Sequence, residues 1–251
     1  MAYTFSNSLL LDKFLIFGDS ITEFSYNPYP NEDGPVQFGF GAALQHTYTR
    51  RLDVVQRGFS GYNTELAIKI LPEVLKIEHQ QSKSKIKVST LFFGTNDACL
   101  GGVQRIDIHR YIENIKFLIG LFKENDIKVI LIGPSKYDEV KFKPGREKDF
   151  EAGIIRSNEN NLLYSNSLKK IAQEENIPFV DLYSTFDQFT NWKDLLIDGL
   201  HYTGEAYKIL YNEVLDKIRT WYPELAPENI PFKLPYWRDA VVNGVDIEPT
   251  V

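Results

Sequence analysis

Near the start of the chain, four consecutive apolar residues, Phe14 to Phe17, lead directly into Gly18-Asp19-Ser20. A short apolar run that ends at a turn signal is typical of a strand buried on both faces, as in a parallel sheet. Ser20 would then follow the carboxyl end of that strand, which is where open α/β sheets form their ligand crevices. A serine in this position is either a helix cap or a nucleophile, and other parts of the chain decide between the two roles.

The remainder of the sequence alternates apolar runs with helical periodicity. Strands are expected at residues 14–17, 52–55, 88–93, 127–132 and 179–182, and helices around residues 66–75, 111–122, 168–172 and 206–218. This alternation predicts an α/β protein with three layers, in which helices cover both faces of a central, mostly parallel five-stranded sheet. A chain of 251 residues can form one such domain, and we expect a single domain over residues 1–251.

Two segments fall outside this alternation and are expected at the surface. Residues 136–148 are rich in charge, which indicates a solvent-exposed excursion after the fourth strand. Residues 223–251 contain five of the twelve prolines, and a regular helix does not tolerate them. We expect this stretch to be an extended tail packed on the domain, where Phe232, Tyr236 and Trp237 would narrow a site at the edge of the sheet.

A carboxylate and an imidazole lie close together in Asp198-Gly-Leu-His201. A serine hydroxyl is a weak nucleophile at neutral pH and needs an adjacent base. An imidazole is the usual base, and a carboxylate on its far nitrogen fixes the tautomer and stabilises the imidazolium. One local turn can hold the hydrogen bond between Asp198 and His201, and Thr203 follows as a helix N-cap. We therefore expect this pair, the partner of Ser20, on a loop directly before the last helix.

Two other segments place small or amide residues directly after expected strands. Gly94-Thr-Asn-Asp97 follows the third strand, and Gly58-Phe-Ser-Gly-Tyr62 follows the second. Acyl transfer requires hydrogen-bond donors aimed at the oxygen on which negative charge develops. The side-chain amide of Asn96 and the backbone N–H groups of Gly61 and Ser20 are therefore the candidate donors.

In this order, the four segments resemble the four sequence blocks of the SGNH hydrolases, also called GDSL esterases. The blocks are Gly-Asp-Ser-Ile-Thr at Ser20, the glycine Gly61, Gly-Thr-Asn-Asp at Asn96 and Asp-Gly-Leu-His at His201. Each block alone is a weak signal, but the ordered combination is specific and covers most of the chain. Within the family, the chain is similar to the isoamyl acetate-hydrolysing esterase subfamily in residues 56–62, 96–99 and 236–239.

The resemblance implies the flavodoxin-like SGNH-hydrolase fold and a serine esterase that cleaves short acetate esters of small alcohols. Residue by residue, it implies Ser20 as the nucleophile, His201 as the base and Asp198 as the residue that orients His201. It also implies Gly61 and Asn96 as oxyanion donors, together with the Ser20 amide. No cofactor is expected, and no spaced ligand motif in the sequence supports a catalytic metal.

Other functions fit the sequence less well than a serine esterase. A phosphate-transfer enzyme of the haloacid dehalogenase type would need a second aspartate where Ile21 stands. A non-catalytic binding module on the same fold would lack a catalytic residue, and none is missing. A related hydrolase acting on thioesters, lysophospholipids or acetylated sugars stays open, because the blocks define chemistry more firmly than substrate. Ser60 is a rival nucleophile, but the α/β-hydrolase elbow needs glycine where Tyr62 stands.

The remaining polar residues near the blocks are interpreted as structural. Asp19 and Asp97 are expected to hold turns by accepting backbone N–H bonds. The single cysteine, Cys99, excludes an internal disulfide and is expected to fill apolar space. The other histidines are expected to be solvated helix residues rather than ligands: His46, His79 and His109.

Charge and hydropathy exclude several classes of partner. A formal net charge of −6 argues against nucleic acid or an anionic membrane surface. No apolar run is long enough for a membrane-spanning helix, and the leucines at 9–11 lack the preceding basic residues of a secretory signal. We therefore expect a cytoplasmic protein whose partner is a small-molecule ester, with a homodimer left open.

Overall fold

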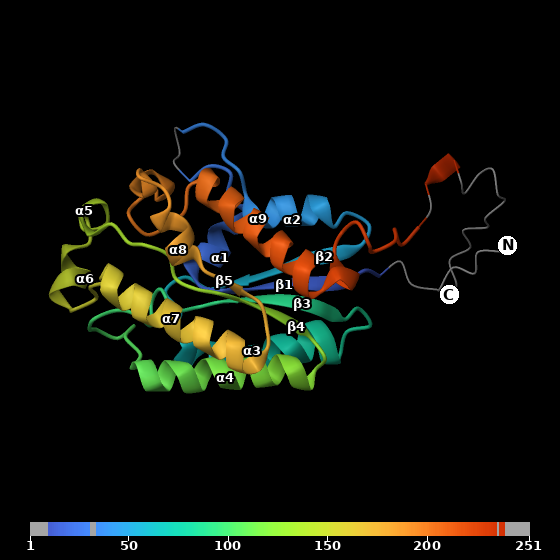
Figure 1. Ribbon diagram of the computed structural model, residues 1–251, viewed down its shortest axis with the longest axis horizontal. Helices are drawn as coiled ribbons and strands as arrows, with labels where there is room; N and C mark the ends of the chain where they lie inside the picture. The colour runs from blue at the N-terminus through green and yellow to red at the C-terminus, as the bar shows by residue number, and fades with distance from the viewer. Residues whose placement is uncertain (1–9, 31–33, 235, 239–251) are drawn as a thin grey trace.

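The computed structural model describes residues 10–30, 34–234 and 236–238. Five strands form one parallel sheet in the order β2-β1-β3-β4-β5 (Figure 1). They are β1 (Asp12–Gly18), β2 (Leu52–Gly58), β3 (Ile86–Phe92), β4 (Lys128–Ile132) and β5 (Phe179–Val180). All five expected strands are confirmed, although β5 is only two residues long and Leu182 begins a helix.

Helices cover both faces of this sheet and give the three expected layers (Figure 1). One face carries α1 (Ser20–Glu23), α2 (Phe40–Thr47), α8 (Leu182–Asp187) and α9 (Gly204–Trp221), and the other carries α3 (Thr64–Leu75), α4 (Ile108–Glu124) and α7 (Asn158–Glu175). Two short helices, α5 (Glu139–Phe142) and α6 (Glu147–Glu151), lie between β4 and α7. The described residues also form three short 3₁₀ helices, η1 (Phe24–Tyr26), η3 (Trp192–Leu195) and η4 (Pro223–Leu225), and one π-helical turn, η2 (Lys76–Gln80).

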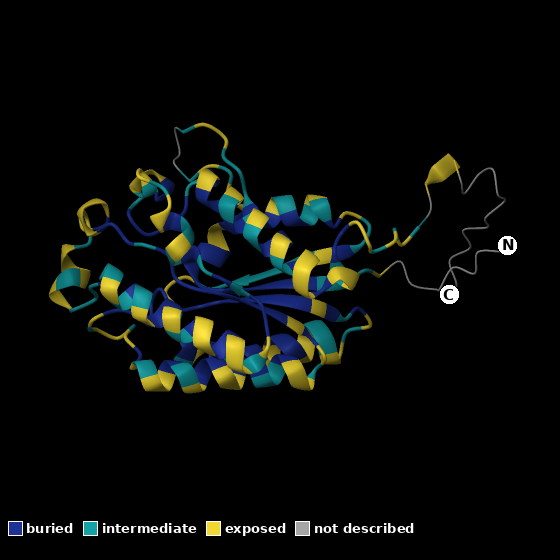
Figure 2. Ribbon diagram, viewed as in Figure 1, coloured by how far each residue is buried: buried dark blue, intermediate teal, exposed yellow. Residues whose placement is uncertain are grey.

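The apolar run of β1 is buried on both sides because successive side chains of a strand point to opposite faces. Phe14 and Ile16 belong to the core beneath α2 and α9, whereas Leu15 and Phe17 belong to the core beneath α3, α4 and α7. All four side chains are fully buried, and each contributes about 1.5–3 kcal/mol relative to exposure. Figure 2 shows the same pattern, with buried residues along the sheet and exposed residues on the outward faces of the helices.

The strand order places the carboxyl end of β1 at a switch point. The connection from β1 to β2 passes through α2 on one face, and the connection from β2 to β3 passes through α3 on the other. Ligand sites of open α/β sheets form where the strand order reverses in this way. Ser20 follows β1 at this point, as the sequence predicts.

The excursion after β4 is only partly exposed, so the expectation for residues 136–148 is wrong in part. Tyr137 and Phe142 are buried and pack with Leu200 in a small cluster of their own. Their rings meet edge to face with centroids 5.5 Å apart. Two aromatic side chains within a charged stretch therefore attach the excursion to the loop that carries Asp198 and His201.

The described part of the proline-rich tail, residues 223–234 and 236–238, packs at the other end of the sheet, so the expectation that its aromatic residues narrow the site is wrong. The Lys233 N–H donates to the carbonyl of Arg50 at 2.9 Å, and the guanidinium of Arg51 lies 4.1 Å from the centre of the Phe232 ring. These arginines directly precede β2, whereas the site lies beyond the carboxyl ends of the strands. Tyr236 lies near Arg50 as well. Stacking on these two cations draws the tail away from Ser20, and residues 239–251 lie outside the described part of the chain.

Candidate active site

Ser20 is held at the first position of α1 by the residues on either side of it. Asp19 caps the helix, and its carboxylate accepts the N–H of Ile21 at 3.0 Å. A Cβ at Gly58 would lie 2.1 Å from the backbone nitrogen of Glu23, so glycine there allows α1 to lie directly on the end of β2. Ser20 is 7% exposed, which keeps its hydroxyl fixed but reachable.

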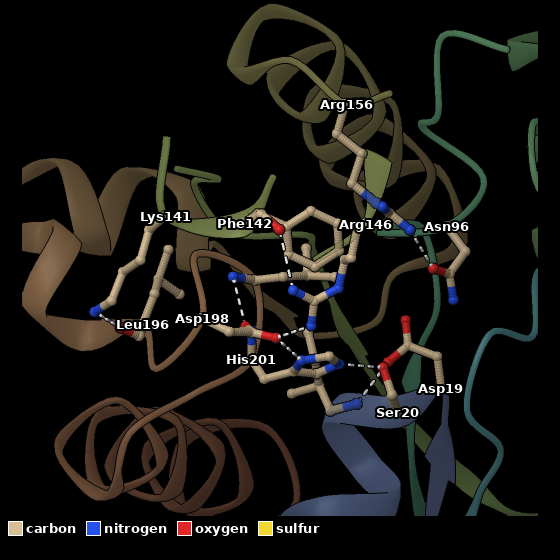
Figure 3. Close-up of polar contacts among 12 residues, drawn as sticks. Asp19, Ser20, Asn96, Lys141, Phe142, Arg146, Arg156, Leu196, Asp198 and His201 are labelled. Carbon is tan, nitrogen blue, oxygen red and sulfur yellow. Dashed lines mark hydrogen bonds and ion pairs between the residues drawn. The ribbon is translucent and has the colours of Figure 1, made fainter. Parts of the chain in front are cut away.

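The three expected triad residues come together at hydrogen-bond distance (Figure 3). His201 Nε2 lies 3.0 Å from Ser20 Oγ, and His201 Nδ1 lies 2.9 Å from Asp198 Oδ2. The other carboxylate oxygen of Asp198 accepts the N–H groups of Leu200 at 3.1 Å and His201 at 2.8 Å. Thr203 caps α9, as predicted, so the pair sits on the loop before the last long helix.

The environment of Asp198 keeps its carboxylate ionised. Burial by itself would raise the pKa of Asp198, but hydrogen bonds from the side chain and backbone of His201, together with its charge, hold that pKa well below its usual value. An ionised carboxylate can only accept a hydrogen bond, so His201 Nδ1 must be the donor in its bond to Asp198. Nδ1 therefore carries the proton, and Nε2 is left to accept one from the Ser20 hydroxyl.

The expected oxyanion donors follow β1, β2 and β3, which are neighbours in the sheet. Gly61 adopts a φ of +77°, a conformation that favours glycine. Among the described residues, the N–H groups of Ser20 and Gly61 have no intramolecular acceptor. The Asn96 amide nitrogen donates one hydrogen to the carbonyl of Tyr62 at 2.8 Å and keeps its second hydrogen for another acceptor.

The two buried aspartates have the structural roles that the sequence predicts. Asp19 caps α1, and Asp97 accepts the N–H of Thr64 at 2.9 Å and also the Thr64 hydroxyl. Burial raises the pKa of Asp19 to about 6. Burial, with a further contribution from the charge of Asp19, raises the pKa of Asp97 to about 7. Both groups therefore titrate between the usual aspartate value and neutral pH.

Two arginines that the sequence does not predict lie at the site, and both come from the chain between β4 and α7. Arg146 pairs with Asp198, with Nη2 2.7 Å from Oδ2, and its guanidinium stacks 4.1 Å from the centre of the Phe142 ring. Arg156 is 4% exposed and donates from Nη2 to Asn96 Oδ1 at 2.8 Å. No motif or periodicity marks either position, because both act on residues far away in the sequence.

A cavity of about 370 Å³ lies beside His201. The ring of Phe24 meets the imidazole of His201 edge to face, with centroids 5.3 Å apart. The cavity is lined by aromatic and aliphatic side chains together with three polar residues, Asn27, Asp198 and His201: Phe24, Asn27, Pro30, Ile197, Asp198, His201, Tyr202 and Tyr207. The volume is at the lower end of the range for small-molecule sites, which is about 300–1,000 Å³.

The rival residues lie outside this arrangement. Ser60 is exposed, and its N–H donates to the carboxylate of Glu23. His46 and His109 are exposed on helices, as expected, but His79 is half-buried and accepts the N–H of Ile86 at 3.1 Å, so its role is structural. Cys99 is fully buried, which raises the pKa of its thiol, and its Sγ lies 3.8 Å from Gln104 Oε1. Within the described residues, no group of His, Cys, Asp and Glu could hold a metal ion.

Serine hydrolases have a serine hydroxyl hydrogen-bonded to an imidazole, which is in turn hydrogen-bonded to a carboxylate. In this chain the same arrangement lies at the switch point of a parallel α/β sheet. A model of the GDSL-like lipase/acylhydrolase family matches residues 16–209. The chain belongs to this family, as the sequence blocks predict.

Two relatives of this chain are isoamyl acetate-hydrolyzing esterases by name. The isoamyl acetate-hydrolyzing esterase of Saccharomyces cerevisiae is 45% identical over 94% of this chain and 98% of the yeast protein. The isoamyl acetate-hydrolyzing esterase 1 homolog of Homo sapiens is 32% identical over 93% of this chain and 90% of its own length. Both relatives match over nearly their whole length, so the likeness extends beyond the short sequence blocks.

Solved structures support the fold alone, because their sequences are distant. A lipase/acylhydrolase from Enterococcus faecalis has a TM-score of 0.61 at 22% identity and covers 84% of this chain and 96% of its own. An acetylxylan esterase from Geobacillus stearothermophilus has a TM-score of 0.61 at 20% identity and covers 82% of this chain and 94% of its own. Both matches agree with the three-layer α/β architecture.

Proposed function

We propose that this protein is a serine esterase that hydrolyses acetate esters of small alcohols through an acyl-enzyme. The observation that carries the proposal is the unbroken series of hydrogen bonds from Ser20 Oγ through His201 to Asp198. The name of the yeast relative, an isoamyl acetate-hydrolyzing esterase at 45% identity, supports the choice of substrate. A non-catalytic binding module has no need of such a series, and neither does a phosphate-transfer enzyme.

In the first half of the reaction, Ser20 Oγ attacks the ester carbonyl carbon while His201 Nε2 takes the hydroxyl proton. The carbonyl oxygen becomes an oxyanion, which the N–H groups of Ser20 and Gly61 and the amide of Asn96 stabilise. Collapse of this intermediate breaks the bond to the alcohol oxygen. His201 then returns its proton to that oxygen, and the alcohol leaves an acetylated Ser20 behind.

The second half repeats the same steps with water as the nucleophile. His201 takes a proton from water, the resulting hydroxide attacks the acyl carbon, and the same donors hold the new oxyanion. The proton then passes to Ser20 Oγ as the bond to the acyl carbon breaks, and acetic acid leaves and loses its remaining proton to solvent. Asp198 stabilises the imidazolium in both halves, so no cofactor or metal is needed for any step.

The size of the cavity beside His201 supports a small ester. At about 370 Å³, it suits a short acyl group and a small alcohol better than a long hydrocarbon chain. The excursion after β4 adds no long apolar wall, since its exposed positions are mostly charged. Thioesters, lysophospholipids and acetylated sugars remain alternative substrates for the same triad. The preferred acyl length distinguishes a lipase or lysophospholipase from the proposed acetate esterase.

A panel of nitrophenyl esters from acetate to octanoate tests the proposal. Each buried CH₂ is worth ~0.8 kcal/mol, so a long-chain site would gain roughly fourfold in kcat/KM per added CH₂. We expect the opposite trend, with acetate or butyrate best and octanoate poor, and no turnover by Ser20→Ala. A kcat/KM that climbs through octanoate would contradict the acetate assignment and favour a lipase or lysophospholipase.

We also infer that the protein acts in the cytoplasm on a small-molecule ester, without nucleic acid or a membrane as a partner. A single cysteine and an acidic net charge of −6 support this inference. In the described part of the chain, no helix has the length and apolar character needed to cross a bilayer. Fractionation of cells that produce a tagged chain tests the location, and activity in the membrane pellet would contradict it.

A further inference from the structure

A set of hydrogen bonds connects two of the proposed oxyanion donors, the Gly61 peptide after β2 and the Asn96 side chain after β3. Gln104 donates from Nε2 to the carbonyl of Gly61 at 3.0 Å and accepts at Oε1 from Arg156 Nη2 at 3.0 Å. The same Nη2 donates to Asn96 Oδ1 at 2.8 Å, and Asn96 Nδ2 donates to Tyr62 at 2.8 Å. The ring therefore begins and ends on neighbouring residues, Gly61 and Tyr62, and passes through Asn96 on the way.

Arg156 is a buried cation that donates hydrogen bonds to neutral groups beside the site. It is 4% exposed, and among the described residues it forms no ion pair. The groups that accept its hydrogen bonds are all neutral: the Thr95 carbonyl at 3.0 Å and the two side-chain amides of Asn96 and Gln104. The charge of Arg156 acts on the buried carboxylate of Asp19, and its guanidinium lies 5.4 Å from the centre of the Phe142 ring, but only neutral groups accept its hydrogen bonds.

The bond to Arg156 has two effects on Asn96. It fixes Oδ1 toward the guanidinium, so the amide nitrogen must face the opposite way (Figure 3). It also withdraws electron density from the amide, because a hydrogen bond from a charged donor polarises the group that accepts it. Both effects strengthen Asn96 Nδ2 as a donor to a developing oxyanion. The fork of Arg156 is planar and rigid, and an ammonium does not reproduce it.

We propose that Arg156 and Gln104 are positioning residues, which hold the Asn96 amide and the Gly61 peptide in fixed relation as oxyanion donors. This inference rests on the proposed function, since it assigns a catalytic purpose to the network around those donors. Neither residue needs to touch the substrate. Arg156 acts through the Asn96 amide, and Gln104 connects Arg156 to the backbone at Gly61.

A double-mutant cycle on kcat with nitrophenyl acetate tests the inference. Asn96→Ala removes one oxyanion donor and is expected to lower kcat by ~10²–10³ with little change in KM. Arg156→Lys keeps the charge but loses the planar fork, and is expected to lower kcat roughly 10- to 100-fold through misplacement of Asn96. If Arg156 acts through Asn96, adding Arg156→Lys to Asn96→Ala should cost less than about threefold.

The outcomes are distinguishable. An equal loss from Arg156→Lys in both backgrounds, or a change confined to KM, would overturn the positioning role while leaving Asn96 as a donor. No loss of kcat in Asn96→Ala would instead remove the oxyanion assignment of the proposed function, and this inference with it. Arg105→Lys, at an exposed neighbouring arginine outside the network, is the matched control and should keep kcat and the melting temperature unchanged.

A second variant covers the case in which Arg156→Lys does not fold. Gln104→Met removes the bridge between Arg156 and Gly61 without leaving a new buried charge. We expect it to lower kcat with KM nearly unchanged, and to lower kcat much less when Asn96→Ala is already present. Full additivity of Gln104→Met with Asn96→Ala would contradict the coupling, provided that thermal unfolding shows a folded chain.

Discussion

The base side and the oxyanion side of the site are held in different ways. Asp198 and His201 are three residues apart and bond within one loop, whose charged neighbour Arg146 has a side chain 31% exposed. On the oxyanion side, Asn96 is held by Arg156, which is 60 residues away in the sequence and 4% exposed. Local bonds thus fix the proposed base, whereas a long-range bond to a buried arginine fixes Asn96, a proposed oxyanion donor.

This difference determines how each side responds to change. An ion pair as exposed as Arg146 with Asp198 is screened by salt and contributes little. A buried polar network depends instead on every member being present, because an unpaired buried group is costly. We therefore expect the base side to tolerate loss of its arginine and the oxyanion side to be sensitive to loss of Arg156.

The largest effect is expected within the local loop itself. Asp198→Asn removes the carboxylate that holds Nδ1–H of His201, so the imidazole can adopt the wrong tautomer. We expect kcat to fall by ~10⁴ with the fold retained. Steady-state kinetics on nitrophenyl acetate measure this loss. Asp194→Asn, at an exposed position in η3, is the control. Comparable losses in the two variants would show that the site has been misassigned.

The buried aspartates Asp19 and Asp97 and the base-side Asp198 should affect the pH dependence of the unfolding free energy in opposite ways. With a pKa of about 6 for Asp19 and about 7 for Asp97, the folded chain holds protons that the unfolded chain releases from about pH 4 upward. The free energy of unfolding from these groups therefore falls as pH rises from about 4 to 7, by up to about 1.4 kcal/mol per pH unit for each group. The lowered pKa of Asp198 acts in the opposite sense, because its stabilisation is complete above about pH 4 and is lost as pH falls below that value.

Denaturant unfolding from pH 4 to pH 8 measures this dependence. Asp97→Asn should flatten the decline because one of the two titrating groups is gone. Asp216→Asn, on the exposed face of α9, should leave the slope unchanged. If Asp97→Asn and the parent chain show the same slope, burial does not control the titration of Asp97.

The smallest effect is expected at Arg146. Arg146→Met removes an ion pair of Asp198 that solvent already screens. We expect kcat/KM to fall by less than about fivefold, and the difference from the parent chain to shrink in high salt. Lys148→Met, at an exposed position of the same excursion, is the control. A loss of kcat as large as that expected for Arg156→Lys would break the contrast between the two sides.

Much of the fold could be predicted because its cause is local. The apolar run of residues 14–17 is buried on both faces, and period-two alternation distributes it between the two cores. The close approach of Ser20, His201 and Asp198 could be predicted because Asp198 and His201 are close in sequence and Ser20 follows a strand at the switch point. In these cases a short stretch of sequence contains both partners of the interaction, or the whole pattern.

The parts that could not be predicted depend on contacts between distant residues. Arg156 carries no sequence signal, because its partner Asn96 and its burial come from the folded chain. The excursion was expected to be exposed because charges surround Tyr137 and Phe142, yet those two rings pack against Leu200. The tail was expected to be extended because its prolines exclude helix, but nothing local indicates that it stacks on the arginines before β2.

The most direct test of the central claim, that Ser20 is the nucleophile activated by His201, is to map the residue that an organophosphonate modifies. The chain is treated with the reagent, digested and examined by mass spectrometry. We expect one adduct on Ser20 that matches the loss of esterase activity, and neither an adduct nor turnover in Ser20→Ala with an unchanged melting temperature. An adduct on Ser60, or turnover retained by Ser20→Ala, would contradict the claim.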